Sequence, residues 1–463
     1  MSDDEQPIDN PNENIVLDLP STSTINQPDQ LEPQIPSSTS SSSINYLEQW
    51  RGKQKVFWFI SIANGIAQMI LFNIFPAFAA VVGVTSSMMG FLTSIRNLIS
   101  SLFQGTFGRL SDKYGRKHLL LVGFFLIFAM TTILVFIHNP IMLVIVVILQ
   151  SFSLSIIIPV WNAALGDVTE IKGRSTYIGK LTSAGYVVAV GVLLLIVGFF
   201  FLTDSYANRV VLGLTIPKLG WEIHYGVTFA IIAINFLFCF IGILFLRETR
   251  PVNSDKVNPK LRVAFKDKSF RKFLFINSLF GFTMAALWPI YPITQVRILG
   301  MSFYQVAICV AIFSICFGLF GFLGGKISDK IGRKPVILFS RLMMFTIPPL
   351  YIPAILFQQW WFLVLTNVVS GIGNGIFLVV TNSYALDLSS EQLMGAYSGL
   401  KEVAWGIATF LGSICAGFVT QALELSWTLE RTIIVLVIVI TVLRLVVAFG
   451  YLFVTESLTE NDT

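Results

Sequence analysis

The chain has 463 residues, of which 54% are hydrophobic and only 12% are charged, and its mean hydropathy is +0.75. Soluble domains carry about 25% charged residues, so this composition argues against a water-soluble protein. The net charge of +5 reflects basic residues gathered in a few loops and does not indicate a nucleic-acid partner. The four cysteines and three histidines show no metal-ligand spacing, and we expect neither a metal site nor a cofactor.

The first 50 residues differ in kind from the rest of the chain. They contain nine acidic residues, no Lys or Arg, and a run of Ser and Thr from Ser37 to Ser43. Such a segment buries too little apolar area to offset the entropy of ordering it, so residues 1–50 are expected to form a disordered, acidic cytoplasmic tail. A phosphorylated regulatory arm and a plain solvated tail both fit this composition. No basic region followed by an apolar core precedes Arg51, so no cleaved signal peptide is expected.

Twelve apolar segments follow the tail, and each is long enough to cross a bilayer, which takes about 20 helical residues. They predict an all-α membrane protein with twelve transmembrane helices. The predicted spans are residues 56–82, 87–111, 118–137, 140–165, 176–203, 226–247, 273–298, 303–327, 335–356, 360–386, 394–421 and 432–454.

Basic residues in the loops indicate the orientation of the chain. Loops after even-numbered spans contain clusters such as Arg109, Lys113, Arg116 and Lys117, whereas the loops on the opposite side contain very few. The segment 247–272 holds nine more basic residues. Because positively charged loops stay on the cytoplasmic side, we expect a multi-pass protein of the cell membrane with both termini in the cytoplasm.

Two loop segments nearly repeat each other, 108–117 (GRLSDKYGRK) and 325–334 (GKISDKIGRK), and they lie 217 residues apart. Acidic residues at helix ends recur at a similar offset. They are Asp167 and Asp387, which follow spans 4 and 10, and Glu248 and Glu456, which follow spans 6 and 12. The repeats predict two pseudo-symmetric six-helix bundles. The expected bounds are 51–247 and 273–456, joined by a basic cytoplasmic linker over 248–272 and followed by a cytoplasmic tail over 457–463.

The shared frame of these loops resembles the signature of the major facilitator superfamily, Gly-x-Leu-Ala-Asp-Arg-x-Gly-Arg-Lys in loose form, and Ile327 replaces the leucine in the second copy. The resemblance covers about residues 50 to 456. It implies a central cavity lined by helices 1, 4, 7 and 10, with alternating access by rocking of the halves. It also implies a charge latch that closes the cytoplasmic side. The latch residues would be Gly108, Asp112, Gly115, Arg116, Gly325, Asp329, Gly332 and Arg333.

Polar and aromatic side chains inside apolar spans are candidates for substrate contact, because polar groups are costly there. The candidates are Asn64 and Gln68 in span 1, Trp161 and Asn162 in span 4, Trp288, Tyr291 and Gln295 in span 7, and Asn367 and Asn374 in span 10. The resemblance assigns these four spans to the cavity. Each polar residue could instead hydrogen-bond between helices, and Trp288 and Tyr291 could belong to an interfacial aromatic belt.

Arg96 is a candidate of a different kind. It lies about 18 Å along span 2 from the signature glycine Gly108, near mid-membrane. Its counterpart in the second half, Phe313, is apolar, so the duplicated architecture does not require a cation there. Arg96 could face the cavity and attract an anionic or polar substrate, or it could donate to backbone carbonyls. We favour the second interpretation, because span 2 is not one of the four lining helices.

Proton-coupled carriers need a carboxylate that can change its protonation inside the membrane, and spans 1, 4, 7 and 10 have none at mid-span. The coupling candidates are therefore Asp112, Asp167 and Glu402, although a Lys401–Glu402 interaction or helix-end capping is a plainer explanation. The Gly-Pro-x-x-Gly-Gly stretch of many drug–proton antiporters is absent from span 5. The sugar-porter sequence after span 6 is incomplete, with RETR at 247–250.

These observations predict a secondary transporter that moves a small organic solute. Aromatic, amide-bearing spans suit amphipathic solutes better than sugars, which favours a drug-efflux-like exporter. The alternatives are a sugar or organic-anion importer or facilitator of the same superfamily and, from another class, a receptor or scaffold derived from a transporter. No Ser/His/Asp set and no phosphate-binding glycine loop occurs, so no enzymatic activity is expected. The expected partners are the solute, the lipid bilayer and candidate coupling protons, and the expected oligomeric state is a monomer.

Overall fold

The structure is a computed structural model that describes residues 54–169, 174–205, 210–211, 214–215, 219–249, 265–389 and 394–457. These residues belong to one compact unit, which begins at Leu47. The predicted tail over 1–50, most of the predicted linker over 248–272 and all but one residue of the tail over 457–463 lie outside the described residues.

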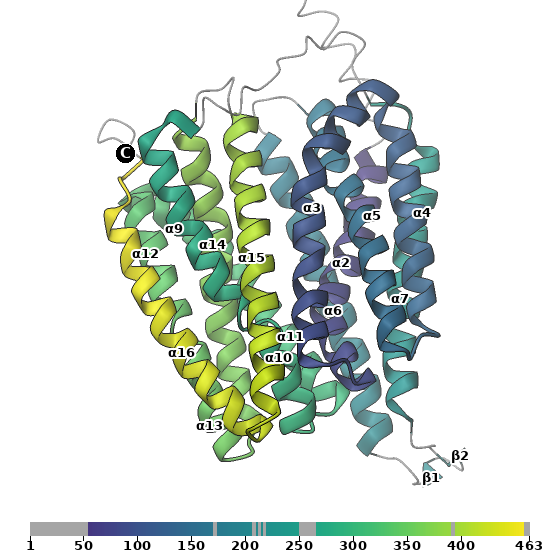
Figure 1. The fold of residues 1–463 in the computed structure, drawn as a ribbon. Helices are drawn as coiled ribbons and strands as arrows, with labels where there is room; N and C mark the ends of the chain where they lie inside the picture. Colours follow the sequence, from purple (N-terminus) through teal and green to yellow (C-terminus); the bar gives the residue numbers. More distant parts are fainter. Residues whose placement is uncertain are drawn as a thin grey trace, which may run out of the picture. The chain divides into compact units, whose positions relative to one another are not determined.

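Six long helices form the first half of the described chain. They are α2 (Gln54–Val82), α3 (Ser86–Tyr114), α4 (Arg116–Leu134), α5 (Pro140–Asp167), α6 (Arg174–Ser205) and α7 (Trp221–Phe245). Between α6 and α7 the short strands β1 (Val210–Val211) and β2 (Leu214–Thr215) form an antiparallel hairpin. We call the end of the helices at this hairpin the hairpin end, and the end with the two repeated loops the signature end (Figure 1).

The second half repeats the six spans with more irregular helices. They are α9 (Lys268–Ala285), α10 (Ile290–Ile293) and the π-helical η1 (Thr294–Ile298) in span 7, α11 (Phe303–Ile331), α12 (Arg333–Met344) with the 3-10 turn η2 (Pro348–Leu350) and α13 (Tyr351–Leu356) in span 9, α14 (Trp361–Asp387), α15 (Met394–Glu424), and α16 (Leu429–Gly450) with the 3-10 turn η3 (Tyr451–Phe453).

Eleven helical stretches of the described chain are long and apolar enough to cross a bilayer. The twelfth, α3, is as long as α2, at 29 residues, but Arg96, Arg109 and several serines lower its hydropathy. The predicted all-α membrane fold of twelve helices is therefore confirmed. The spans predicted over 273–298 and 335–356 are present, but each is broken into shorter helical pieces. Prolines at both breaks remove backbone donors and clash with the preceding turn.

The two halves meet along two helix pairs, α3 with α15 and α6 with α11. In Figure 1, α3 and α15 run side by side near the hairpin end and diverge toward the signature end. Near the hairpin end, the backbone of Gly90 lies so close to Ser413 that an added Cβ would lie 2.5 Å from the Ser413 carbonyl oxygen. The Ser86 hydroxyl donates to Glu424 (2.5 Å) at the same end. We call this α3–α15 contact the seam.

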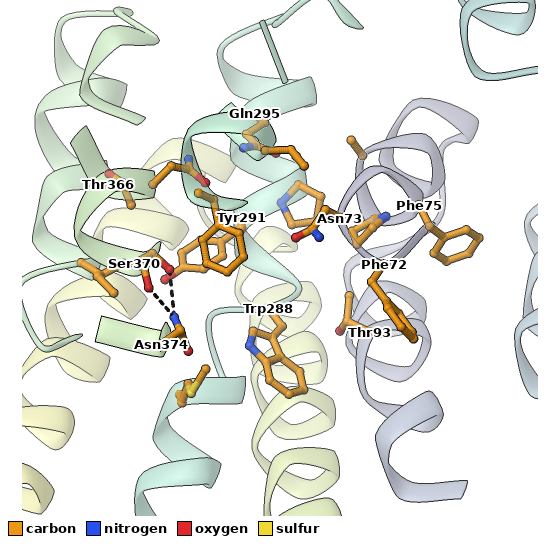
Figure 2. Close-up of a pocket in the computed structure, with 18 of the residues that line it drawn as sticks. Phe72, Asn73, Phe75, Thr93, Trp288, Tyr291, Gln295, Thr366, Ser370 and Asn374 are labelled. Atoms are coloured by element: carbon orange, nitrogen blue, oxygen red, sulfur yellow. Dashed lines mark hydrogen bonds between the residues drawn. The ribbon is translucent and has the colours of Figure 1, made fainter. Parts of the chain in front are cut away.

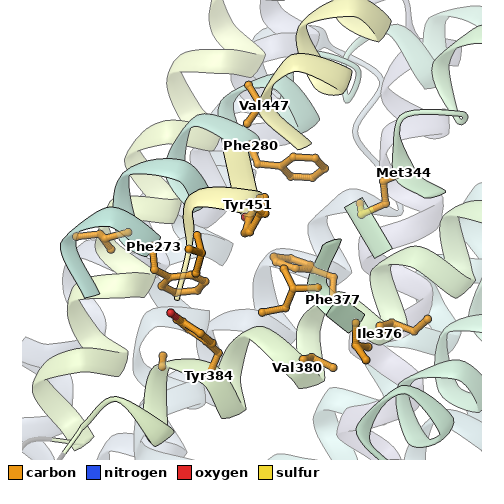
Figure 3. Close-up of a cluster of buried hydrophobic side chains, with 14 of the residues drawn as sticks. Phe273, Phe280, Met344, Ile376, Phe377, Val380, Tyr384, Val447 and Tyr451 are labelled. Atoms are coloured by element: carbon orange, nitrogen blue, oxygen red, sulfur yellow. The ribbon is translucent and has the colours of Figure 1, made fainter. Parts of the chain in front are cut away.

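A dense apolar cluster holds the second half together (Figure 3). It gathers side chains from α9, α12, α14, α16 and η3, among them Phe273, Phe280, Phe377, Tyr384 and Tyr451. Side chains at this packing density fix the relative positions of the helices that carry them. The cluster therefore supports one wall of the cavity described below.

Candidate functional site

The first repeated loop is a tight junction between α3 and α4, organised by Glu248. Gly115 has φ of +96°, a backbone conformation that favours glycine, and a Cβ there would lie 2.5 Å from a Glu248 carboxylate oxygen. The backbone N–H groups of Arg116 (2.7 Å) and Lys117 (3.2 Å) donate to Glu248. A carboxylate from the end of span 6 thus caps the N-terminus of α4.

Arg116 extends this junction into α5. Its Nε donates to Oδ2 of Asp167 (3.0 Å), and its Nη1 donates to the Ser111 hydroxyl. The Arg116 and Asp167 side chains are only 10% and 14% exposed, so the pair is largely removed from water. We call Ser111, Arg116, Asp167 and Glu248 the first loop network.

The second repeated loop has the same arrangement. Gly332 has φ of +99°, and the backbone N–H groups of Arg333 (2.9 Å) and Lys334 (3.0 Å) donate to Glu456. Arg333 donates through Nε to Asp387 (2.9 Å) and through Nη1 to Ser328 (2.8 Å). The second loop network is therefore Ser328, Arg333, Asp387 and Glu456, and Arg333 also pairs with Asp329.

The two latch arginines are therefore paired within their own halves. Arg116 and Arg333 each bind a carboxylate of the same half, and the side chain of Asp112 lies outside the described side chains. Glu402 forms an ion pair with Lys401 (2.9 Å), which matches the plainer alternative for that residue. A latch between the halves in another conformation, and a coupling role for any of these acids, stay predictions.

A cavity of about 450 Å³ lies between the two halves. Helices α2 and α3 line it from the first half, and the second half contributes residues of spans 7 to 10 and of α16. Six of the predicted cavity residues line it: Arg96, Trp288, Tyr291, Gln295, Asn367 and Asn374. Figure 2 shows side chains from α2, from the broken span 7 and from α14 directed toward one space.

The walls of this central cavity are mostly apolar and include several aromatic rings, with amides and hydroxyls between them. Tyr291 stacks on Tyr351 with ring centroids 4.7 Å apart, beside the break in span 7. Asn374 donates to the carbonyl (2.8 Å) and hydroxyl (3.1 Å) oxygens of Ser370, as the dashed lines in Figure 2 mark. Asn367 donates to the Leu363 carbonyl (2.7 Å). Both amides donate within α14, and no substrate role for them is yet tested.

The other four predicted cavity residues line a smaller, separate cavity of about 180 Å³. They are Asn64, Gln68, Trp161 and Asn162, which come from α2 and α5. Gln68 donates to Asn64 (2.9 Å), so these two amides partly satisfy each other. The resemblance assigned spans 1, 4, 7 and 10 to one cavity, whereas the structure divides their polar residues between two.

Arg96 lines the central cavity from α3, and the argument that span 2 lies away from the cavity is wrong. Its side chain is 8% exposed, and its guanidinium lies over the rings of Phe72 (4.6 Å) and Phe75 (5.5 Å). Nη2 donates to Gln150 at 3.5 Å, the limit for a hydrogen bond. The described residues supply Nε with no hydrogen-bond partner. Helix tilt and rotation, which decide what faces a cavity, are set by packing that the sequence does not show.

The sequence analysis missed two buried arginines of the second half. Arg444, on α16, lines the cavity and donates to the carbonyls of Thr283 (3.3 Å), Met284 (2.9 Å) and Met344 (3.1 Å). These carbonyls lie where α9 and α12 end, so Arg444 adds hydrogen bonds at both breaks, where the Met284 and Met344 carbonyls otherwise accept long backbone bonds (3.3 and 3.4 Å). Arg341 lies in the apolar cluster, where it donates to Asn277 (3.0 Å).

A signal for both arginines was present in the sequence. Any charged residue inside a span is a candidate functional site, whichever helix carries it. Restricting the search to spans 1, 4, 7 and 10 left out α12 and α16. Arg341 and Arg444 are 0% and 1% exposed, so both are as deeply buried as the apolar side chains around them.

Known proteins similar to this chain are membrane transporters. The chain is 23% identical to the proton-coupled antiporter flippase LtaA of Staphylococcus haemolyticus over 79% of this chain and 86% of that protein. It is 23% identical to the MFS-type transporter SLC18B1 of Mus musculus over 81% and 82%. A stretch of 122 residues is 33% identical to the MFS-type transporter ppz2 of Metarhizium majus, but it covers only 26% of this chain and 21% of that protein.

Solved structures share the fold at low sequence identity. The nucleoside transporter NupG is similar with a TM-score of 0.66 and 14% identity over 86% of this chain and 97% of that chain. A bacterial homolog to the human lysosomal transporter Spinster is similar with a TM-score of 0.64 and 18% identity over 86% and 95%. These likenesses concern the fold alone.

A family-level match covers nearly all of the helical part of the chain. The sequence profile of the Major Facilitator Superfamily matches residues 57–284 and 273–463. The relatives are named as transporters and not as enzymes. This chain therefore belongs to the Major Facilitator Superfamily of membrane transporters.

Proposed function

We propose that this chain moves a small organic solute through the central cavity by alternating access, and that it works as an exporter. The observation that carries the proposal is a single cavity lined by both halves, beside a seam that joins the halves near the hairpin end. A solute bound there contacts both bundles, so rocking of one bundle against the other would change the end from which the solute is reached.

The loop charges supply the orientation. The signature end carries the basic clusters, so it is proposed to be the cytoplasmic end, with both termini there. Because the named seam contacts lie near the hairpin end, the conformation described here would then be closed to the outside. The loop networks are proposed to hold each half rigid while the halves rock.

Counterflow exchange tests this function. The purified full chain is reconstituted in liposomes preloaded with an unlabelled solute, and entry of the labelled solute is measured across a panel of anionic, neutral and cationic amphiphiles. A transporter exchanges at least one of them above protein-free liposomes. Binding without exchange supports the receptor alternative, and no exchange of any solute contradicts the proposal.

A seam variant sharpens the test. Gly90→Leu places a side chain where even a Cβ lies 2.5 Å from the Ser413 carbonyl oxygen, so it should lower exchange at least about tenfold by preventing closure of the hairpin end. Gly191→Leu is the matched control, because a Cβ on Gly191 in α6 meets nothing within 4 Å. Equal exchange by the two variants would show that seam closure is not part of the cycle.

The organic-anion carrier is the second candidate function, and one observation favours it. Two arginines line the central cavity, whereas a carrier of neutral sugars needs no cation there. Direction and charge of the solute are separate questions. An exporter can therefore also be an anion carrier.

A further inference from the structure

We propose that the transported solute is an organic anion and that Arg96 binds its charged group, with Arg444 contributing a second positive charge from the opposite half. This inference rests on the proposed function, because it names the class of solute that the central cavity takes. It changes the role that the sequence favoured for Arg96, which was a structural one.

The central cavity carries positive charge. Among the described residues that line it, Arg96 and Arg444 are the charged ones, and none is an Asp or Glu. A guanidinium keeps its proton throughout the physiological range. The cavity therefore holds two positive charges in a water-poor interior, and an anion would be favoured there over a neutral or cationic molecule of the same shape.

The two guanidinium groups differ in how many of their N–H donors have hydrogen-bond partners. Arg444 donates three hydrogen bonds to backbone carbonyls, so its geometry is explained by the fold. Arg96 is more than nine-tenths buried, yet the described residues give its Nε no hydrogen-bond partner, and its bond to Gln150 is long. A guanidinium has five N–H donors in a planar fork that matches a carboxylate. Arg96 therefore has donors left for a ligand.

The residues around Arg96 hold its side chain in place without neutralising its positive charge. Gln150 is itself anchored, because its amide donates to the Thr131 hydroxyl (3.2 Å). The rings of Phe72 and Phe75 lie against the guanidinium face, and such cation–π contacts leave the N–H edge free for hydrogen bonds. The guanidinium is thus positioned before a ligand arrives, which lowers the entropy lost on binding.

The second half has no cation at the position equivalent to Arg96. Phe313 occupies the position equivalent to Arg96 in α11, and it lines the same cavity. The fold therefore accepts a phenyl ring at this position. Arg341 supplies a second contrast, because it is equally buried but is not among the lining residues of the cavity.

The walls indicate the rest of the solute. Trp288, Tyr291 and Phe317 offer ring faces, and Asn73 on α2 and Thr93 on α3 offer polar groups in the same cavity as Arg96. A cavity of about 450 Å³ falls in the range of sites for small organic ligands. The solute class is therefore an amphipathic anion, with a carboxylate, sulfonate or phosphate on an aromatic or aliphatic body.

Matched probe pairs test the charge directly. Naphthaleneacetate and naphthaleneacetamide differ by one charge at nearly equal shape, as do naphthalenesulfonate and naphthalenesulfonamide, and naphthyl phosphate extends the series to phosphate. Their affinities are measured by calorimetry on the full chain in lipid nanodiscs. At least one acid should bind about 30-fold more tightly than its amide. Equal affinity within every pair, or no binding of any acid at millimolar concentration, overturns the proposal.

Variants then assign the charge to Arg96. Arg96→Gln should reduce the acid-to-amide affinity ratio about 30-fold, whereas Arg96→Lys should retain part of it. Arg341→Gln is the control and should leave the ratio unchanged. The ratio is measured within each variant, so a partly unfolded preparation does not distort it. A normal ratio in Arg96→Gln overturns the role of Arg96. Exchange of neutral or cationic solutes alone overturns the anion class but leaves the transport function standing.

Discussion

The two halves of the molecule agree at the signature end and differ in the interior. Both loop networks use an arginine, an aspartate and a glutamate in the same geometry, with Nε to carboxylate distances of 3.0 and 2.9 Å. In the interior, Arg96 of the first half corresponds in the repeat to Phe313 of the second. Conversely, Arg341 and Arg444 of the second half occupy the positions of Phe124 and Phe236 in the first, counted from the loop arginines and from the recurring glutamates.

This difference separates two kinds of residue. Where both copies keep the same charged set, the common geometry points to a task that each half performs for itself, namely holding four helix ends together. Where one copy has a cation and the other a phenyl ring, the fold works with either. The asymmetric positions are thus where a duplicated architecture can acquire a preference for one kind of solute.

The largest expected effect is the removal of Arg444. Arg444→Met removes the guanidinium donors from three carbonyls at the helix breaks, two of which also accept a long backbone hydrogen bond (3.3 and 3.4 Å), and this should destabilise the protein by about 4 kcal/mol. Phe236→Met, at the equivalent position of the first half, keeps the side-chain volume approximately and should lower the free energy of unfolding by about 1 kcal/mol. Unfolding in detergent, followed by circular dichroism, measures both. Similar losses would mean that Arg444 does not support the breaks.

The next effect concerns the loop networks, which should respond equally. Arg116→Ala and Arg333→Ala each remove the arginine from a largely buried ion pair, at a cost of about 3 kcal/mol in the same unfolding measurement. Arg109→Ala, on the exposed side of the first loop, serves as the control and should change stability by less than about 0.5 kcal/mol. A large loss in only one half would break the proposed equivalence.

A charge exchange tests the interior asymmetry. Arg96→Phe should abolish the preference for anionic probes, about 2 kcal/mol of binding energy, and adding Phe313→Arg should restore part of it, because both positions line one cavity. Affinity ratios of the matched acid and amide measure the preference. If the double variant binds the acid and the amide equally well, the preference for anions depends on the contacts that Gln150 and Phe72 make with Arg96, and a positive charge elsewhere in the cavity does not replace it.

The smallest effect concerns the helix caps. Glu248→Gln and Glu456→Gln keep an acceptor for the backbone N–H groups but lose the charge, so each should cost about 1 kcal/mol. Melting temperatures in parallel preparations suffice for the comparison. A stabilising change in either variant would contradict the capping role.

The sequence predicted the fold well because its signals are local. Apolar run length, loop charge and the repeated loops each act over a few tens of residues, and together they predicted twelve spans in two related sets. The breaks inside spans 7 and 9 were not predicted, although Pro289 and Pro348 were visible signals.

The site was harder to predict because it depends on how each helix is rotated about its axis and on how deep each residue lies in the bundle. The sequence placed Asn64 and Trp288 in one cavity, and only packing shows that they line two. The sequence marked Arg96 as unusual, but whether its side chain faces the cavity depends on how α3 packs. Glu248 was noted as a recurrence without a role, since its capping contact with Arg116 joins residues 132 positions apart.

The absence of acids among the described lining residues of the central cavity has an electrical consequence. A single anionic solute that crosses without a counter-ion carries one charge through the membrane potential, a free-energy change of about 2.3 kcal/mol per 100 mV. Because the inside of a cell is negative, that term drives the anion outward. A voltage applied across the vesicle membrane would then drive export with no other energy source.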